Sequence, residues 1–150
     1  MTNEVVGGPW VQAALFCERV LIEHDNVPSM IRVIDQIRHP IVASGPGVVA
    51  PTLPYQLNGF IALKPGAAKG RFDYAIVMET PAGLKRQVAN GSFTFAGGPH
   101  NGVNIPFQLA IVFDQEGLYW FDIVLDGDRV LTRMPFYVEY VVMRPGVAGD

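Results

Sequence analysis

The side chains that could carry out covalent chemistry in this sequence are few. Cys17 is the only thiol, and a thiol acts as a nucleophile only after a neighbouring base or cation favours its thiolate form. It lies in an apolar stretch, so a buried, inert cysteine is the favoured interpretation. The sequence has no Gly-x-Ser-x-Gly elbow and no dinucleotide fingerprint. We therefore expect a protein that is not an enzyme, with no catalytic residues and no cofactor.

A glycine-rich segment, Gly97-Gly98-Pro99-His100-Asn101-Gly102, has the composition of a loop that could bind a phosphate or an oxyanion. Pro99 removes one backbone donor, however, and no predicted helix follows whose dipole would favour an anion. A plain connecting loop is the better interpretation.

Two groups of polar residues have the chemistry of metal ligands. His24 and Asp25 lie beside a predicted turn and would approach Asp35 and His39 if the flanking segments pair. Loop carboxylates of the kind that bind calcium occur at Asp114, Glu116, Asp126 and Asp128. The second group lies at opposite ends of one predicted strand, roughly 33 Å apart at about 3.3 Å per residue. Surface and turn residues are the better interpretation of both groups, so we expect no metal site.

Charge is distributed unevenly along the chain. Residues 40–63 contain no charged side chain, and in residues 87–113 the only titratable side chain is His100. Prolines and glycines interrupt both stretches, so neither can span a bilayer. Residues 41–55 predict a long loop, which is uncommon unless it is functional or disordered. We expect this loop either to fold over an open end of the core or to present an apolar partner-binding surface made of Val48, Val49, Leu53 and Tyr55.

Trp120 is the other candidate binding residue. Strand alternation directs it away from the core, with Asp122 and Gln108 at nearby outward positions. A tryptophan beside polar groups can stack on a sugar or anchor a protein interface. It could equally lie beneath a loop or beneath the N-terminal segment that carries Trp10.

Period-two alternation predicts the strands that would position these residues. A hairpin between residues 107–113 and 119–125 would pair Phe113 with Tyr119 and Ile111 with Phe121. A two-residue turn at Gly127-Asp128 would add a third strand, with these pairs: Tyr119 with Phe136, Phe121 with Met134, Leu125 with Val130, Asp122 with Arg133, and Asp126 with Arg129.

Earlier segments follow the same logic. Strands are expected over residues 57–63, 72–79 and 84–95, and residues 30–38 are expected to form one strand because β-branched residues dominate there. Residues 12–23 could be a buried strand or a short helix. About eight strands with frequent turns predict a single domain over residues 1–150, an all-β antiparallel two-sheet β-sandwich, with residues 1–9 loosely packed or flexible.

Composition bounds the rest. Only 17% of the 150 residues are charged and the net charge is −3, without any basic run, so neither nucleic acid nor a membrane is an expected partner. The lone cysteine and the absence of a basic and apolar leader indicate a cytoplasmic protein.

Two sets of residues, one toward each end of the chain, have a familiar pattern. The first set is Ala14-Leu15-Phe16-Cys17, the turn at Asp25-Asn26, and Met30-Ile31-Arg32-Val33. The second set is residues 117–123, Leu125-Asp126-Gly127 and residues 134–138. Together they resemble a family of uncharacterised bacterial β-sandwich domains of unknown function. Such domains carry a glycine near position 32, where this chain has Arg32. The resemblance implies a β-sandwich and a bacterial cytoplasmic setting, and it implies no activity.

These observations predict a non-enzymatic β-sandwich module that binds another protein or itself, through residues 41–55, an edge strand, or both. The alternative is a small-ligand or carbohydrate-binding module centred on Trp120.

Overall fold

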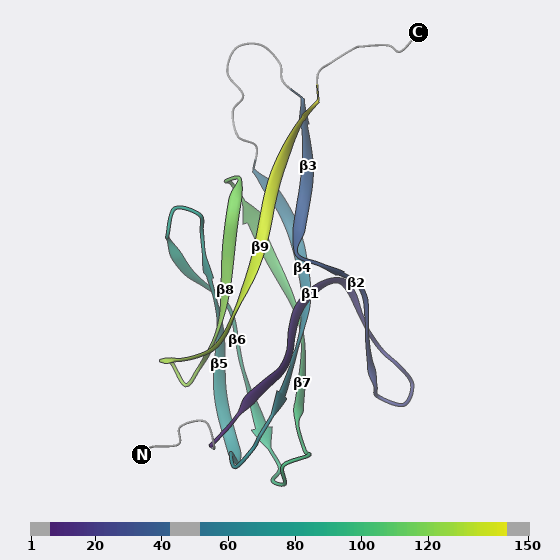
Figure 1. The fold of residues 1–150 in the computed structure, drawn as a ribbon, viewed down its shortest axis with the longest axis vertical. Helices are drawn as coiled ribbons and strands as arrows, with labels where there is room; N and C mark the ends of the chain where they lie inside the picture. Colours follow the sequence, from purple (N-terminus) through teal and green to yellow (C-terminus); the bar gives the residue numbers. More distant parts are fainter. Residues whose placement is uncertain (1–6, 43–51, 144–150) are drawn as a thin grey trace.

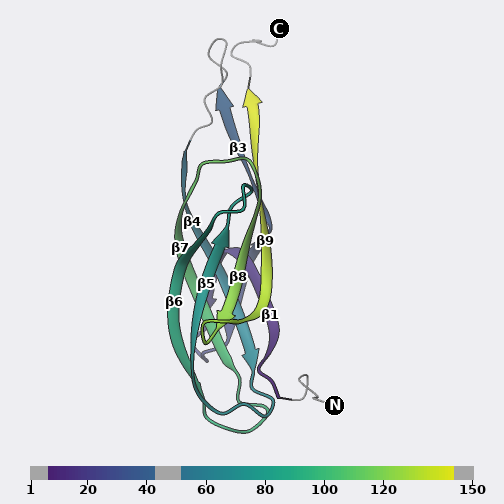
Figure 2. The same cartoon turned by 90° about the vertical axis from the view of Figure 1, so that its left-hand side faces the viewer.

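A computed structural model describes residues 7–42 and 52–143, and these residues form two β-sheets without any helix. Sheet A has the strand order β2-β1-β4-β7, and sheet B has the order β3-β9-β8-β5-β6. Figures 1 and 2 show the strands running along the long axis of the molecule. The nine strands of the described residues are β1 (Trp10–Ile22), β2 (Pro28–Ile34), β3 (Gln36–Val42), β4 (Leu53–Lys64), β5 (Gly70–Glu79), β6 (Lys85–Phe95), β7 (Val103–Phe113), β8 (Gly117–Leu125) and β9 (Arg129–Met143).

The apolar sides of the two sheets meet in one core. Phe16 of β1 joins them, because its ring lies 5.9 Å from that of Phe107 in sheet A and 5.1 Å from that of Phe121 in sheet B. Phe113 likewise packs edge-on against Tyr119, with ring centroids 4.8 Å apart. Such aromatic contacts add to the stabilisation from burial.

Gly59 of β4 is required where β4 lies alongside β1, opposite Phe16. A Cβ atom at this position would lie 2.1 Å from Cζ of Phe107 and 2.7 Å from the backbone oxygen of Leu15. The absence of a side chain therefore lets the two strands and the Phe107 ring approach closely.

The predicted hairpin between residues 107–113 and 119–125 is wrong. β7 pairs with β4 in sheet A, whereas β8 pairs with β5 and β9 in sheet B. Both strands bury the predicted inward side chains, Phe113 and Tyr119 among them. Alternation determines which side chains face the core but not which strand lies alongside, so the same pattern suits two strands that face each other across the core.

The predicted pairing of β8 with β9 is confirmed over most of its length. Tyr119 pairs with Phe136, Phe121 with Met134, and Asp122 with Arg133. Near the turn the prediction fails: a register shift after Ile123 pairs Leu125 with Arg129 instead of Val130. The turn contains three residues instead of two, and Asp126 and Gly127 both have positive φ. The extra residue in β9 is a β-bulge, which alternation alone does not reveal.

The segment predicted as one strand over residues 30–38 is two strands. β2 belongs to sheet A and β3 to sheet B, and the chain crosses between them at Asp35, whose carbonyl accepts a hydrogen bond from Tyr137 N at 2.9 Å. β3 runs parallel to β9, so the expectation of purely antiparallel sheets is wrong at this edge. Figure 2 shows these two strands side by side at the end of the molecule that holds the C-terminus.

The expected loop over residues 41–55 is shorter than predicted. Ile41 and Val42 belong to β3 and pair with Val142 and Met143. Leu53 and Tyr55 belong to β4 and pair with Phe113 and Ile111. Val48 and Val49 lie outside the described residues.

The N-terminal segment was expected to be loosely packed over residues 1–9. Residues 1–6 lie outside the described part of the chain. Gly8 and Pro9 are buried, and a Cβ on Gly8 would lie 2.2 Å from the carbonyl oxygen of Pro65. Gly8 is therefore packed against the β4–β5 turn.

Candidate functional site

The two uncharged stretches of the sequence become neighbouring strands. β4 comes from residues 40–63 and the first residue after them, and β7 comes from residues 87–113. The two strands pair along their whole length, from Leu53 with Phe113 to Leu63 with Val103. Over residues 54–58 of β4 and 106–112 of β7, the outward side chains form a surface without formal charge, which we call the β4–β7 face: Pro54, Gln56, Asn58, Pro106, Gln108, Ala110 and Val112.

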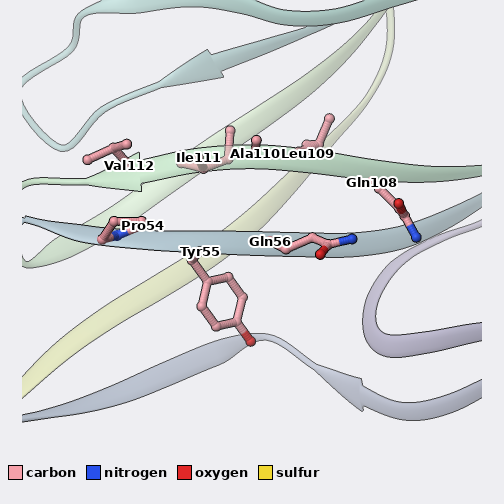
Figure 3. Close-up of a pocket in the computed structure, with 8 residues that line it drawn as sticks. All are labelled: Pro54, Tyr55, Gln56, Gln108, Leu109, Ala110, Ile111 and Val112. Atoms are coloured by element: carbon pink, nitrogen blue, oxygen red, sulfur yellow. The ribbon is translucent and has the colours of Figure 1, made fainter.

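A hollow of about 510 Å³ lies on this face. Pro54 to Gln56 of β4 and Gln108 to Val112 of β7 line it, as Figure 3 shows. Val112 is 52% exposed, whereas Leu109 and Ile111 point into the core and are 1% exposed. The floor of the hollow is therefore backbone together with small apolar and amide side chains.

A second hollow, of about 360 Å³, continues along β7. Arg19, Val20 and Ile22 of β1 form one side of it, and the other side contains Asn58, Pro106, Phe107 and Gln108. The β1–β2 hairpin extends sideways from the other strands in Figure 1. Gln108 lines both hollows, so they adjoin at this residue.

Asn58 is held in place where the hairpin leaves the sheet. Its Nδ2 donates to the backbone oxygen of Glu18 at 2.8 Å, and its Oδ1 accepts from Gln56 Nε2 at 3.5 Å. The first contact is a normal hydrogen bond and the second is at the limit of one. Asn58 therefore ties β4 to β1 at Glu18, the residue before Arg19, and both Asn58 and Arg19 line the second hollow.

Of the two alternatives for residues 41–55, Leu53 and Tyr55 do not match the exposed apolar surface. Both pack against the core, and the Tyr55 ring lies 6.2 Å from Phe113 and 6.5 Å from Phe136. Figure 3 shows Tyr55 pointing away from β7. Burial, with the charge of Glu18 as a smaller cause, raises the pKa of Tyr55. Both residues were misplaced because β4 begins earlier than predicted.

Trp120 lies on the outer side of sheet B, within a charged cluster. The Arg133 guanidinium carbon is 4.7 Å from the Trp120 ring centroid, which is a cation–π distance. Arg133 Nε donates to Asp122 Oδ1 at 2.7 Å, and Arg133 also pairs with Glu79. These ion pairs raise the pKa of Arg133, chiefly through the hydrogen bond to Asp122. Asp122 is near Trp120 as predicted, whereas Gln108 is on the other sheet.

The remaining chemical candidates are dispersed. Cys17 is 1% exposed, and burial raises the pKa of its thiol, which disfavours a nucleophilic thiolate. Across residues 7–42 and 52–143, no three His, Cys, Asp or Glu side chains come close enough to hold a metal ion. Two of the four carboxylates with calcium-ligand chemistry, which the sequence favours as turn residues, act within the fold: Asp126 Oδ1 accepts from Asp73 N, and Glu116 Oε1 accepts from Tyr140 N. The same described residues contain no helix long enough to cross a membrane.

Comparisons with known proteins return only remote structural likenesses. No protein-family model matches the chain, and no curated protein matches it. Part of the β-glucosidase from Listeria innocua, solved in complex with glucose, is similar with a TM-score of 0.49 and 10% identity. The alkylpurine DNA glycosylase AlkC of Pseudomonas fluorescens, bound to DNA with an abasic site analog, is similar with a TM-score of 0.42 and 16% identity.

These likenesses concern parts of much longer proteins. The match covers 73% of this chain but only 15% of the glucosidase chain, and 70% of this chain but 28% of the glycosylase chain. Neither likeness assigns a family or an activity to this protein.

Proposed function

We propose that this chain is a non-enzymatic interaction or assembly module that binds a protein, either a different chain or a second copy of itself, on the β4–β7 face. The observation that carries the proposal is the pairing of two uncharged stretches into one exposed surface with adjoining hollows. Depletion of charge at the centre of a patch is a compositional mark of protein interfaces.

The position of β7 supports the same proposal. It is the last strand of sheet A, and an edge strand offers backbone groups to another chain. Pro106 lies within β7, as prolines in sheets do at edges, where a missing N–H costs no ladder hydrogen bond. The edge strand anticipated from the sequence is therefore assigned to β7 in this proposal.

The carbohydrate-binding alternative at Trp120 is less well supported. Arg133 covers one side of the indole ring and is itself held by Asp122 and Glu79. A sugar stacking on that side would have to displace an arginine that already has two ion pairs. A glycan array on the wild type and on Trp120→Ala tests this alternative, which requires a signal that the variant loses.

The family resemblance belongs to the same proposal. We propose that the two sheets form a β-sandwich of the bacterial family that the chain ends resemble, and that the protein works in the cytoplasm. Arg32 has a φ of +53°, a conformation that glycine adopts without steric cost. The glycine that the resemblance implies near this position thus has a structural reason. The free, buried Cys17 agrees with a reducing compartment.

Site-specific photo-crosslinking tests the proposed face. A photoreactive amino acid replaces Ala110 on the β4–β7 face or, as the matched control, exposed Ser92 on β6 of sheet B. The proposal expects a discrete adduct from position 110, with a second copy or with another protein, and none of that mass from position 92. Equal labelling from both positions, or no adduct at position 110, would overturn it.

A further inference from the structure

The β4–β7 face carries one continuous groove. The larger hollow extends along β7 from Val112 to Gln108, and the second continues from Gln108 to Pro106 and then meets β1. Seven residues of β7 therefore border the groove, which makes it about 20 Å long at roughly 3.3 Å per residue. That length accommodates six or seven residues of an extended chain.

The groove has a single charged side chain, at one end. Arg19 is the only charged residue among those lining either hollow. It is exposed, and within residues 7–42 and 52–143 its guanidinium has no carboxylate partner. The other groups that border the groove are amides and apolar side chains. A ligand whose charge complements the groove therefore carries one negative group, at the β1 end.

The amide side chains favour a peptide over a purely apolar ligand. In the same part of the chain, Gln108 makes no side-chain hydrogen bond, although it stands where the two hollows adjoin. A glutamine there can both donate to and accept from the backbone of a bound chain. Asn58 is already bonded to β1, so it supports the groove wall.

We infer that the occupant is an extended peptide segment of the partner, with uncharged residues along β7 and one acidic side chain paired with Arg19. This inference rests on the proposed function and adds to it the chemistry of the bound segment. The acidic group is assigned to an aspartate or glutamate side chain because Val20 and Ile22 of β1 line the second hollow together with Arg19, so the lining of the hollow does not stop at the arginine.

Sets of peptides that differ from each other only at one end test the inference. The probes are seven-residue peptides, acetylated and amidated, with uncharged randomised positions and one end position that is Glu, Gln or Lys. A fourth set keeps Gln but has a free C-terminal carboxylate. Binding is measured by fluorescence anisotropy for the wild type, Arg19→Gln and Arg19→Glu. Arg86→Gln is the control, because Arg86 is also exposed and also lacks a carboxylate partner in the described residues.

The inference expects the Glu peptides to bind the wild type about fivefold more tightly than their Gln counterparts, as an exposed ion pair can supply. Arg19→Gln removes the preference for Glu peptides, and Arg19→Glu replaces it with a preference for Lys peptides. Arg86→Gln leaves the preference for Glu peptides unchanged. Equal binding of Glu and Gln peptides, a preference that survives Arg19→Gln, or no binding by any peptide would overturn it. Tightest binding by the free-carboxylate set would overturn the assignment to a side chain.

The two proposals fail separately. An adduct at position 110 together with no preference for Glu would leave the β4–β7 face as the interface and remove the acidic segment. Loss of the position 110 adduct would remove the interface itself.

Discussion

The outer sides of the two sheets differ in how their polar groups are satisfied. On sheet B, Asp122 is only 7% exposed, and its carboxylate is bonded to Arg133, which in turn pairs with Glu79 and covers Trp120. On sheet A, the β4–β7 face has no formal charge, and Gln108 has no side-chain partner in the described residues. The polar groups around Trp120 on sheet B are bonded to each other, whereas the side-chain amide of Gln108 on sheet A has no such partner in the described residues.

This contrast shows that residues whose type suggests binding in the sequence are not the residues that lack partners in the structure. Trp120 and its charged neighbours attract attention in the sequence, yet their contacts are satisfied within the chain. The uncharged residues of β4 and β7 are individually unremarkable, but together they border the two hollows. The function we propose therefore depends on groups without partners on a shared surface more than on the chemical character of single residues.

The largest effect is expected from breaking the charged cluster. Asp122→Asn removes the buried negative charge that pairs with the Arg133 guanidinium and leaves a neutral acceptor in its place, and we expect it to lower the free energy of unfolding by about 2 kcal/mol. Gln108→Ala on the opposite sheet should change it by less than about 0.5 kcal/mol. Urea denaturation of both variants measures the difference. Equal losses would show that the two outer sides do not differ in the way described.

A smaller loss of stability is expected where the chain crosses from β7 in sheet A to β8 in sheet B. The Tyr119 hydroxyl donates to the Gln115 carbonyl at 2.9 Å and accepts from Gln115 N at 3.1 Å. Tyr119→Phe removes both bonds and should cost about 1 kcal/mol at neutral pH. The variant keeps the aromatic ring, which is 0% exposed in the common core, so urea denaturation of the variant and the wild type measures the loss of these two hydrogen bonds.

The pH dependence of this variant has a definite sign. Burial raises the pKa of Tyr119 in the folded protein, against the lowering effect of its hydrogen bond to Gln115. Above the ordinary tyrosine pKa of about 10, the unfolded chain releases a proton that the folded chain retains, so wild-type stability falls as pH rises. Tyr119→Phe lacks this loss, and the gap between the two proteins should narrow in alkaline denaturation curves. A constant gap would contradict the shift.

The smallest effect is expected in the hairpin that borders the groove. Arg32 combines a left-handed φ of +53° with an exposed ion pair to Glu18. Both Arg32→Gly and Arg32→Ala remove the ion pair, but only glycine relieves the backbone strain. Arg32→Gly should therefore be more stable than Arg32→Ala by up to about 1 kcal/mol. Thermal unfolding of the pair measures this difference, and equal stabilities would show that position 32 does not favour glycine.

Local patterns predicted much of the fold but less of the site. The β8–β9 register followed from Tyr119 opposite Phe136 and Asp122 opposite Arg133, because a short turn leaves few ways to pair both faces. The β7–β8 hairpin failed although its inward residues were correct. Leu53 and Tyr55 were placed in a loop because prolines at 51 and 54 suggested irregular structure. At Pro54, however, β4 has only β7 as a neighbour, since its pairing with β1 extends from Asn58 to Lys64.

The amino-acid sequence by itself determined that the protein is all-β, which side chains face inward along β7, β8 and β9, and where charge is absent. These properties depend on period-two alternation and composition, which each segment carries locally. Only the tertiary structure decided that β4 and β7 lie together, that Gln108 faces away from Trp120, and that Arg19 reaches the end of their shared groove. Pairing between distant strands depends on how whole apolar surfaces fit against each other across the core, and no local pattern encodes that choice.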